Sequence, residues 1–186
     1  MSLLNSIASW LMKKRMHQID LFIKYPHEVQ DEWLQQLLKE GAKTEFGKLH
    51  ELSQIKNYDQ FCSKVPLQDY ESLKPMIERM QTGVQNLLWP TEIQWFAKSS
   101  GTTDKSKFLP VSSESLDNCH YKAGMDMVTL YCSIYSETKL FTGKNLALGG
   151  SLQELRTGNF TRLQGDVSAI IIQHLPFWAE YFRAPD

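Results

Sequence analysis

The chain has 186 residues, of which 42% are hydrophobic and 22% are charged, as is typical of a soluble globular protein with one substantial core. Its formal net charge of −1 excludes an overall basic surface of the kind that binds nucleic acid. The three cysteines are widely spaced and form no Cys-x-x-Cys pair. This pattern favours reduced thiols in a cytoplasmic protein over a disulfide framework or a zinc site.

The N-terminal segment is apolar from Leu3 to Met12, which is too short a run to span a membrane. Positive charges follow this run, at Lys13, Lys14 and Arg15, whereas a secretory signal carries them before it. We therefore expect no membrane span and a cytoplasmic location.

Helices dominate the predicted first half of the chain. Apolar periodicity predicts a helix over residues 3–24, and Pro26 and Gly41 suit the start and end of a second. The first helix could lie on a membrane surface, but docking on its own domain explains the same pattern and is favoured. Thr44–Gly47 is predicted to be a turn, and shorter helices follow at residues 58–64 and from the cap residue Asp69 to Gly83.

Two short strands, Ile93–Ala97 and Lys107–Val111, flank a loop rich in hydroxyl groups. The loop combines a glycine turn, serine and threonine hydroxyls and lysines, which are the groups that polyphosphate oxygens require. It is not a P-loop, because the Gly-x4-Gly-Lys-Ser/Thr spacing is absent and a strand follows. On composition alone, a polar turn that binds nothing is the favoured interpretation.

A long helix is predicted from about Glu114 to Glu137, capped by Ser112 or Ser113. Its apolar stripe predicts a core helix. We expect Cys119, Cys132 and His120 to lie in or beside that core.

Beyond this helix, the predicted elements are shorter. Residues 145–150 are predicted to be a buried strand that ends in a glycine turn, where α/β folds often meet ligands. The apolar run Val167–Ile172 fits a helix or a strand, and a further helix begins at Phe177.

Three segments of the sequence, in order, resemble motifs of one known family. The first is Thr44-x2-Gly47, and the second runs from Val65-Pro66-Leu67 through Tyr70-Glu71 and Lys74-Pro75 to Gly83. The third is the hydroxyl-rich loop, Ser99-Ser100-Gly101-Thr102-Thr103-x3-Lys107. This loop resembles the phosphate-binding motif of adenylate-forming enzymes, the superfamily of acyl-CoA synthetases and luciferases. With its flanks, it is similar to the auxin-responsive Gretchen Hagen family of acyl-acid amido synthetases, in its bacterial form. Asp104 departs from the glycine that is usual in the wider superfamily.

The resemblance implies an α/β fold, the N-terminal part of an adenylate-forming, luciferase-like large domain. Residues 1–85 would be mostly helical, and residues 86–186 would form the α/β part with the phosphate loop. The later family motifs, a Ser-Ser-Glu block and a Tyr-Arg-x-Gly-Asp block, are not found after Gly150. The chain is therefore expected to be a truncated portion that lacks the C-terminal part of the enzyme.

The resemblance also implies an activity, namely ATP-dependent adenylation of a small carboxylic acid and transfer of the acyl group to an amine or amino acid. The residues that match the family motif and would bind ATP phosphates are Ser99, Ser100, Gly101, Thr102, Thr103 and Lys107. Ligands for Mg²⁺ are expected outside this chain, which would be inactive alone. Arg79 is expected to form a salt bridge with a neighbour rather than to contact substrate. The alternative is a complete, non-catalytic module that retains the scaffold and binds a nucleotide or a partner.

Overall fold

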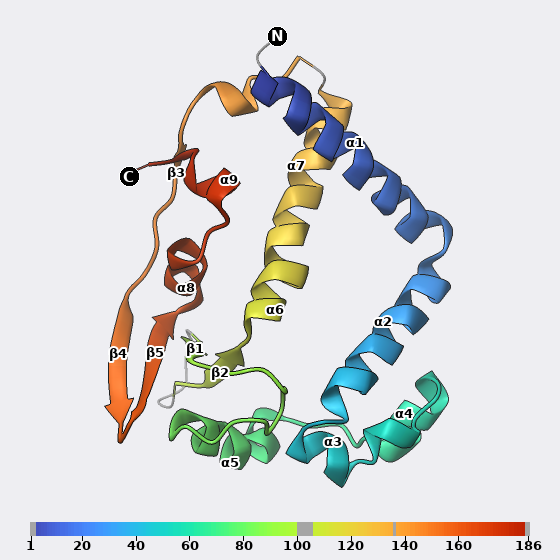
Figure 1. The fold of residues 1–186 in the computed structure, drawn as a ribbon, viewed down its shortest axis with the longest axis vertical. Coiled ribbons are helices and arrows are strands. Elements are labelled where there is room, and N and C mark those ends of the chain that lie inside the picture. The colour runs from blue at the N-terminus through green and yellow to red at the C-terminus, as the bar shows by residue number, and fades with distance from the viewer. Residues whose placement is uncertain (1–2, 100–105, 136, 185–186) are drawn as a thin grey trace.

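The computed structural model describes residues 3–99, 106–135 and 137–184, and Figure 1 shows their arrangement. Helices α1 (Leu3–Lys24) and α2 (Pro26–Gly41) form one side of the molecule, and α7 (Lys122–Ile134) runs between that side and the sheet, with one end against α1. Helices α3 (Glu45–Leu49), α4 (Tyr58–Lys64) and α5 (Tyr70–Gln81) lie together at one end, with the short helix η1 (Leu52–Gln54). The helix-rich start followed by a sheet agrees with the α/β prediction.

Helix α1 docks on α7, as favoured from the sequence. Ile19 is buried, and the guanidinium of Arg15 forms a bidentate ion pair with the carboxylate of Asp126, in which Nη2 lies 2.8 Å from Oδ2. Since hydrogen bonding and charge from Asp126 outweigh desolvation, the pKa of Arg15 is raised. None of the helices in the described part of the chain is both long and apolar enough to cross a membrane.

The sheet has the strand order β2-β1-β5-β4. Strands β1 (Trp95–Lys98) and β2 (Phe108–Val111) form the predicted hairpin, and β1 pairs in parallel with β5 (Phe160–Asp166). Strand β4 (Leu152–Thr157) pairs antiparallel with β5 and forms the opposite edge. The carboxyl ends of β1 and β5 therefore lie side by side at the same end of the sheet, where Lys98 is the register partner of Asp166.

The largest core cluster lies between α5 and the hairpin. Its buried members are Ile77, Met80, Leu87, Ile93 and Phe96. A second cluster joins α2 to η1, and a third packs β1 against the helices that follow the hairpin, around Ile170 of α8 (Val167–Gln173). Because Phe96 is completely buried and belongs to the largest cluster, β1 is the strand most firmly fixed by packing.

The prediction of a turn at Thr44–Gly47 is wrong. Thr44 is instead the N-cap of α3, since its hydroxyl oxygen accepts a 2.9 Å hydrogen bond from the N–H of Gly47. The same hydroxyl donates to the carbonyl of Gly41, 2.7 Å away. A short polar segment with glycine has the composition of a turn, and only the buried surroundings of Thr44 favour a helix here.

The long helix predicted after the hairpin ends at Ile134 rather than at Glu137. It is built from α6 (Ser113–Ser115), a π-helical segment η2 (Leu116–Tyr121) and α7, with Ser112 as the N-cap. Cys119 and His120 are exposed rather than in the core, because the wider π turn changes which residues face the sheet. Cys132 is half-buried, and burial raises the pKa of its thiol.

The buried strand predicted at residues 145–150 is also wrong. Strand β3 contains only Asn145–Leu146, pairs with the equally short β6 (Arg183–Ala184), and leaves Leu146 and Leu148 exposed. A buried strand needs packing on its faces, and no described element covers these side chains. The apolar run after β5, which fitted a helix or a strand, forms the helix α8. The helix predicted to begin at Phe177 is the short α9 (Phe177–Glu180), and η3 (Leu140–Thr142) completes the described elements.

Candidate phosphate-binding hairpin

The β1–β2 hairpin brings the two ends of the hydroxyl-rich loop together. The backbone N–H of Ser99 donates a 2.9 Å hydrogen bond to the carbonyl of Lys107, which extends the pairing one residue beyond Lys98 and Phe108. Of the six predicted site residues, Ser99 and Lys107 thus lie directly opposite each other. The other four, Ser100, Gly101, Thr102 and Thr103, lie outside the described residues, as does Asp104.

Ser99 can offer its hydroxyl to a ligand but not its backbone N–H. The N–H is already bonded to Lys107 within the hairpin.

Lys107 is exposed, and its ammonium nitrogen lies 5.2 Å from the centre of the Tyr70 ring. Asp69, the residue before Tyr70, has a lowered pKa, chiefly because Ser72 hydrogen-bonds to its carboxylate, with a smaller contribution from the charge of Lys107. The cation at the exit of the loop is therefore close to α5, although these segments are far apart in the sequence.

Strand β5, which pairs with β1, places a carboxylate at the same end of the sheet as Lys98. Asp166 ends β5, and its Oδ2 accepts a 3.0 Å hydrogen bond from the N–H of Ser151. The preceding Gly150 donates its N–H to the hydroxyl of Ser168. A side chain at Gly150 would collide with the Asp166 carboxylate, since a Cβ there would lie 2.0 Å from Oδ2. The glycine turn that was expected near a ligand thus lies next to Asp166, at the end of the strand that pairs with β1. Sequence reasoning missed Asp166, although its position directly before the apolar run Val167–Ile172 could have indicated it.

Besides the Asp166 carboxylate, two lysines and a hydroxyl lie near the carboxyl end of β1. Among them, no group of three or more His, Cys, Asp or Glu side chains is placed to hold a metal ion. Lys98, Lys107 and the Ser99 hydroxyl suit phosphate oxygens. These groups therefore suit an anionic ligand.

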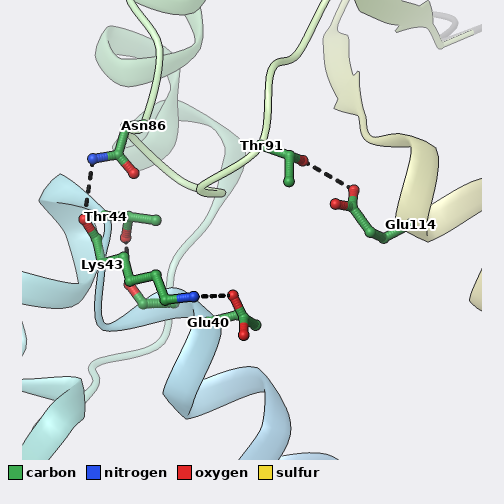
Figure 2. A network of polar contacts seen from close by, with 7 residues as sticks. Glu40, Lys43, Thr44, Asn86, Thr91 and Glu114 are labelled. Carbon is green, nitrogen blue, oxygen red and sulfur yellow. Dashed lines mark hydrogen bonds and ion pairs between the residues drawn. The ribbon is translucent and has the colours of Figure 1, made fainter.

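The segment that leads into β1 is held by hydrogen bonds to the helices, as Figure 2 shows. The side-chain amide of Asn86 donates to the carbonyl of Lys43 at 3.0 Å, and the hydroxyl of Thr91 donates to Glu114 at 3.0 Å. In return, the N–H groups of Glu45 and Phe46 donate to the carbonyls of residues 86 and 87. These contacts fix the entry to the hairpin from both sides.

Arg79 forms the predicted salt bridge. Its guanidinium donates two hydrogen bonds to the carboxylate of Glu45, at 2.6 and 2.9 Å. These hydrogen bonds hold the pKa of Glu45 below its ordinary value. Arg79 therefore joins α5 to α3, and Glu45 is its contact in this structure.

Comparison with known proteins finds a family match over nearly the whole chain. Residues 15–185 match the GH3 family N-terminal domain. Indole-3-acetic acid-amido synthetase GH3.2 of Arabidopsis thaliana is 33% identical over 122 residues, which are 63% of this chain and 22% of that protein. Jasmonoyl–L-amino acid synthetase JAR6 of Nicotiana attenuata is 28% identical over 108 residues, covering 57% of this chain and 19% of that protein.

The fold is also similar to a solved structure. The GH3.15 acyl acid amido synthetase superposes with a TM-score of 0.71 at 20% identity, covering 88% of this chain and 29% of that one. The chain thus spans about a fifth to a third of the length of the relatives that it matches.

Proposed function

Because the chain belongs to the GH3 family, whose N-terminal domain it matches, we propose that it supplies the ATP phosphate-binding hairpin of an acyl-acid amido synthetase of the adenylate-forming kind. The observation that carries this proposal is the closure of the loop by the Ser99–Lys107 hydrogen bond. This closure places a hydroxyl and a cation on opposite sides of the loop that matches the family's phosphate motif.

The proposed reaction begins with attack of a carboxylate oxygen on the α-phosphorus of ATP. The new P–O bond forms as the bond to pyrophosphate breaks, so the protein mainly has to align two anions and neutralise charge. The Ser99 hydroxyl would donate to a phosphate oxygen, together with Ser100, Gly101, Thr102 and Thr103. Lys107 would stabilise the negative charge that develops on the pyrophosphate.

The second substrate would be an amine or an amino acid that takes the acyl group. The names of the relatives support this class, since they include an indole-3-acetic acid-amido synthetase and a jasmonoyl–L-amino acid synthetase. We propose the class of reaction for this chain, and no particular acid or amine.

Residues 1–186 would be the N-terminal portion of the enzyme's large domain, with a mostly helical part to residue 85 and an α/β part after it. The chain's match to about a fifth of the length of a relative supports its being a portion of such an enzyme. Mg²⁺ ligands and the remaining contacts to the nucleotide would lie in the rest of the enzyme. The chain alone would then not complete the reaction.

The test is exchange of labelled pyrophosphate into ATP by the enzyme that contains this chain, in the presence of its carboxylic acid. We expect Lys107→Ala and Thr102→Ala each to slow exchange by an order of magnitude or more. Lys13→Ala is the matched control, because Lys13 is an exposed lysine on α1, and should leave the rate unchanged.

Unchanged exchange in both loop variants would refute the site assignment. ATP binding that depends on Lys107, without any exchange across a panel of acids, would instead support a nucleotide-binding module.

A further inference from the structure

Tyr70, the first residue of α5, contacts two consecutive residues at the exit of the loop. Its hydroxyl accepts a 3.0 Å hydrogen bond from the backbone N–H of Phe108. The ammonium nitrogen of Lys107 lies over its ring, 5.2 Å from the ring centre. Since β2 is an edge strand, the Phe108 N–H points away from β1 and would otherwise have no partner within the sheet.

The position of the Tyr70 ring is fixed from the other side by α5 and the core. The carboxylate of Asp69 caps the helix and accepts hydrogen bonds from the N–H and the hydroxyl of Ser72, at 2.8 and 2.5 Å. The ring itself packs against the core cluster that contains Met80 and Phe96. The face that Lys107 meets therefore belongs to the rigid part of the molecule.

The ring face and the Asp69 carboxylate both attract the ammonium group of Lys107. An aromatic face carries partial negative charge and attracts an ammonium group, and Asp69 adds a full negative charge nearby. A long lysine side chain at an exposed position otherwise samples many rotamers. The contact therefore restricts the rotamers of Lys107 and keeps its ammonium group near the Tyr70 ring.

We propose that Tyr70 is a positioning residue that holds the Lys107 ammonium beside the loop, ready for the oxygens of a polyphosphate. This inference rests on the proposed function, because it assigns Lys107 to that ligand. The ring supplies the attraction, and the hydroxyl fixes Phe108, the first residue of β2, which directly follows Lys107. Tyr70→Phe keeps the ring and loses only the hydroxyl, whereas Tyr70→Met keeps most of the bulk and loses the aromatic face.

The test uses the enzyme that contains this chain, with its lysine side chains labelled for NMR and the Lys107 signal assigned with Lys107→Arg. In the wild type, we expect the Lys107 Cε protons to shift upfield in the ring current of Tyr70. The shift should persist in Tyr70→Phe and vanish in Tyr70→Met. Tyr131→Met is the control, because Tyr131 is an exposed tyrosine on α7.

Titration with tripolyphosphate then measures the functional consequence. Loss of the ring contact should weaken binding roughly two- to fivefold in Tyr70→Met, the range expected for an exposed cation–π contact, with less change in Tyr70→Phe. A ring that only packs in the core would give equal effects in both variants or none.

The outcomes separate the two proposals. If Lys107→Ala weakens tripolyphosphate binding but Tyr70→Met does not, the positioning role is refuted and the phosphate site stands. If the wild-type Lys107 signal shows no ring-current shift, the positioning role is refuted even if Tyr70→Met fails to fold. If the shift is present but neither tripolyphosphate nor ATP perturbs Lys107, the proposed function fails and the positioning role fails with it.

Discussion

Two helices with similar apolar stripes have opposite surroundings. The stripe of α5 is buried against the hairpin, where Met80 is 1% exposed, whereas on α7 Met127 and Ile134 are 69% and 70% exposed. The buried residue of α7 is instead Thr129. An apolar period therefore predicts that a helix forms, but its neighbours decide which of its faces is covered.

The difference divides the molecule into a hairpin junction and an α7 face. The hairpin junction comprises α3, α5, residues 86–93 and β1, which share buried side chains and backbone hydrogen bonds. The α7 face comprises the exposed side chains Met127, Leu130, Tyr131, Ile134 and Tyr135. Substitutions should be costly in the first region and nearly neutral in the second.

The largest expected effect is that of Phe96→Ala. Removing this fully buried ring from the centre of the junction should lower the free energy of unfolding by about 3–5 kcal/mol. Met127→Ala on the α7 face should change it by no more than about 0.5 kcal/mol. Urea unfolding followed by circular dichroism measures both, and equal costs would refute the division into two regions.

A pair of glycines gives the next comparison. A Cβ at Gly47 would lie 1.9 Å from the carbonyl oxygen of Gly41, so Gly47→Ala should destabilise the chain by about 1–3 kcal/mol or more. A Cβ at Gly124 in α7 meets no atom within 4 Å, and Gly124→Ala should stabilise the helix by roughly 0.5–1 kcal/mol. Urea unfolding measures both changes in the free energy of unfolding. Changes of the same sign would contradict the structure at one of the two positions.

Two helix caps give a smaller contrast. Thr44 caps α3 inside the junction and is fully buried, while Ser112 caps α6 through a 3.0 Å bond to the N–H of Ser115. Each change to alanine should cost about 0.5–2 kcal/mol, with Thr44→Ala at the upper end because the Gly41 carbonyl also loses one of its two donors and keeps only the backbone N–H of residue 44. A larger loss for Ser112→Ala, measured by thermal unfolding, would contradict this order.

The smallest effect is the pH dependence of the Glu45–Arg79 pair. Arg79 holds the pKa of Glu45 below its ordinary value of 4.5, so the pair's contribution to stability is present above pH 4.5 and is lost as the pH falls through the lowered value. Glu45→Gln should therefore melt at a lower temperature than the wild type at pH 7, and the two should converge in acid. Arg79→Met should give the same profile, and a difference that persists at low pH would assign the effect to packing.

The elements with strong local signals were predictable from the sequence. Pro26 and the apolar period locate α2, Asp69 locates the start of α5, and β-branched and aromatic residues locate the hairpin. The errors occurred where tertiary contacts decide. The buried hydroxyl of Thr44 converts an expected turn into a helix start, and the π turn places Cys119 in solvent.

The contacts of the candidate site likewise fall into those that local sequence predicts and those that tertiary packing decides. The opposition of Ser99 and Lys107 follows from hairpin pairing, which is local in sequence. The contact of Tyr70 with Lys107 and the position of Asp166 beside Lys98 depend on packing and on parallel pairing across long stretches of chain. No periodicity in one sequence encodes which distant residues meet at a sheet edge.

The hydrogen bond between Ser99 and Lys107 also decides when entropy is lost. Joining the two ends of a loop costs conformational entropy that grows only with the logarithm of its length, so each doubling adds roughly 0.6 kcal/mol. Here the ends are joined by the fold itself. That cost is therefore incurred once, on folding, and does not recur in the free energy of binding a ligand. Inserting one residue between positions 99 and 107 should accordingly change the stability of the fold very little, whatever it does to the ligand.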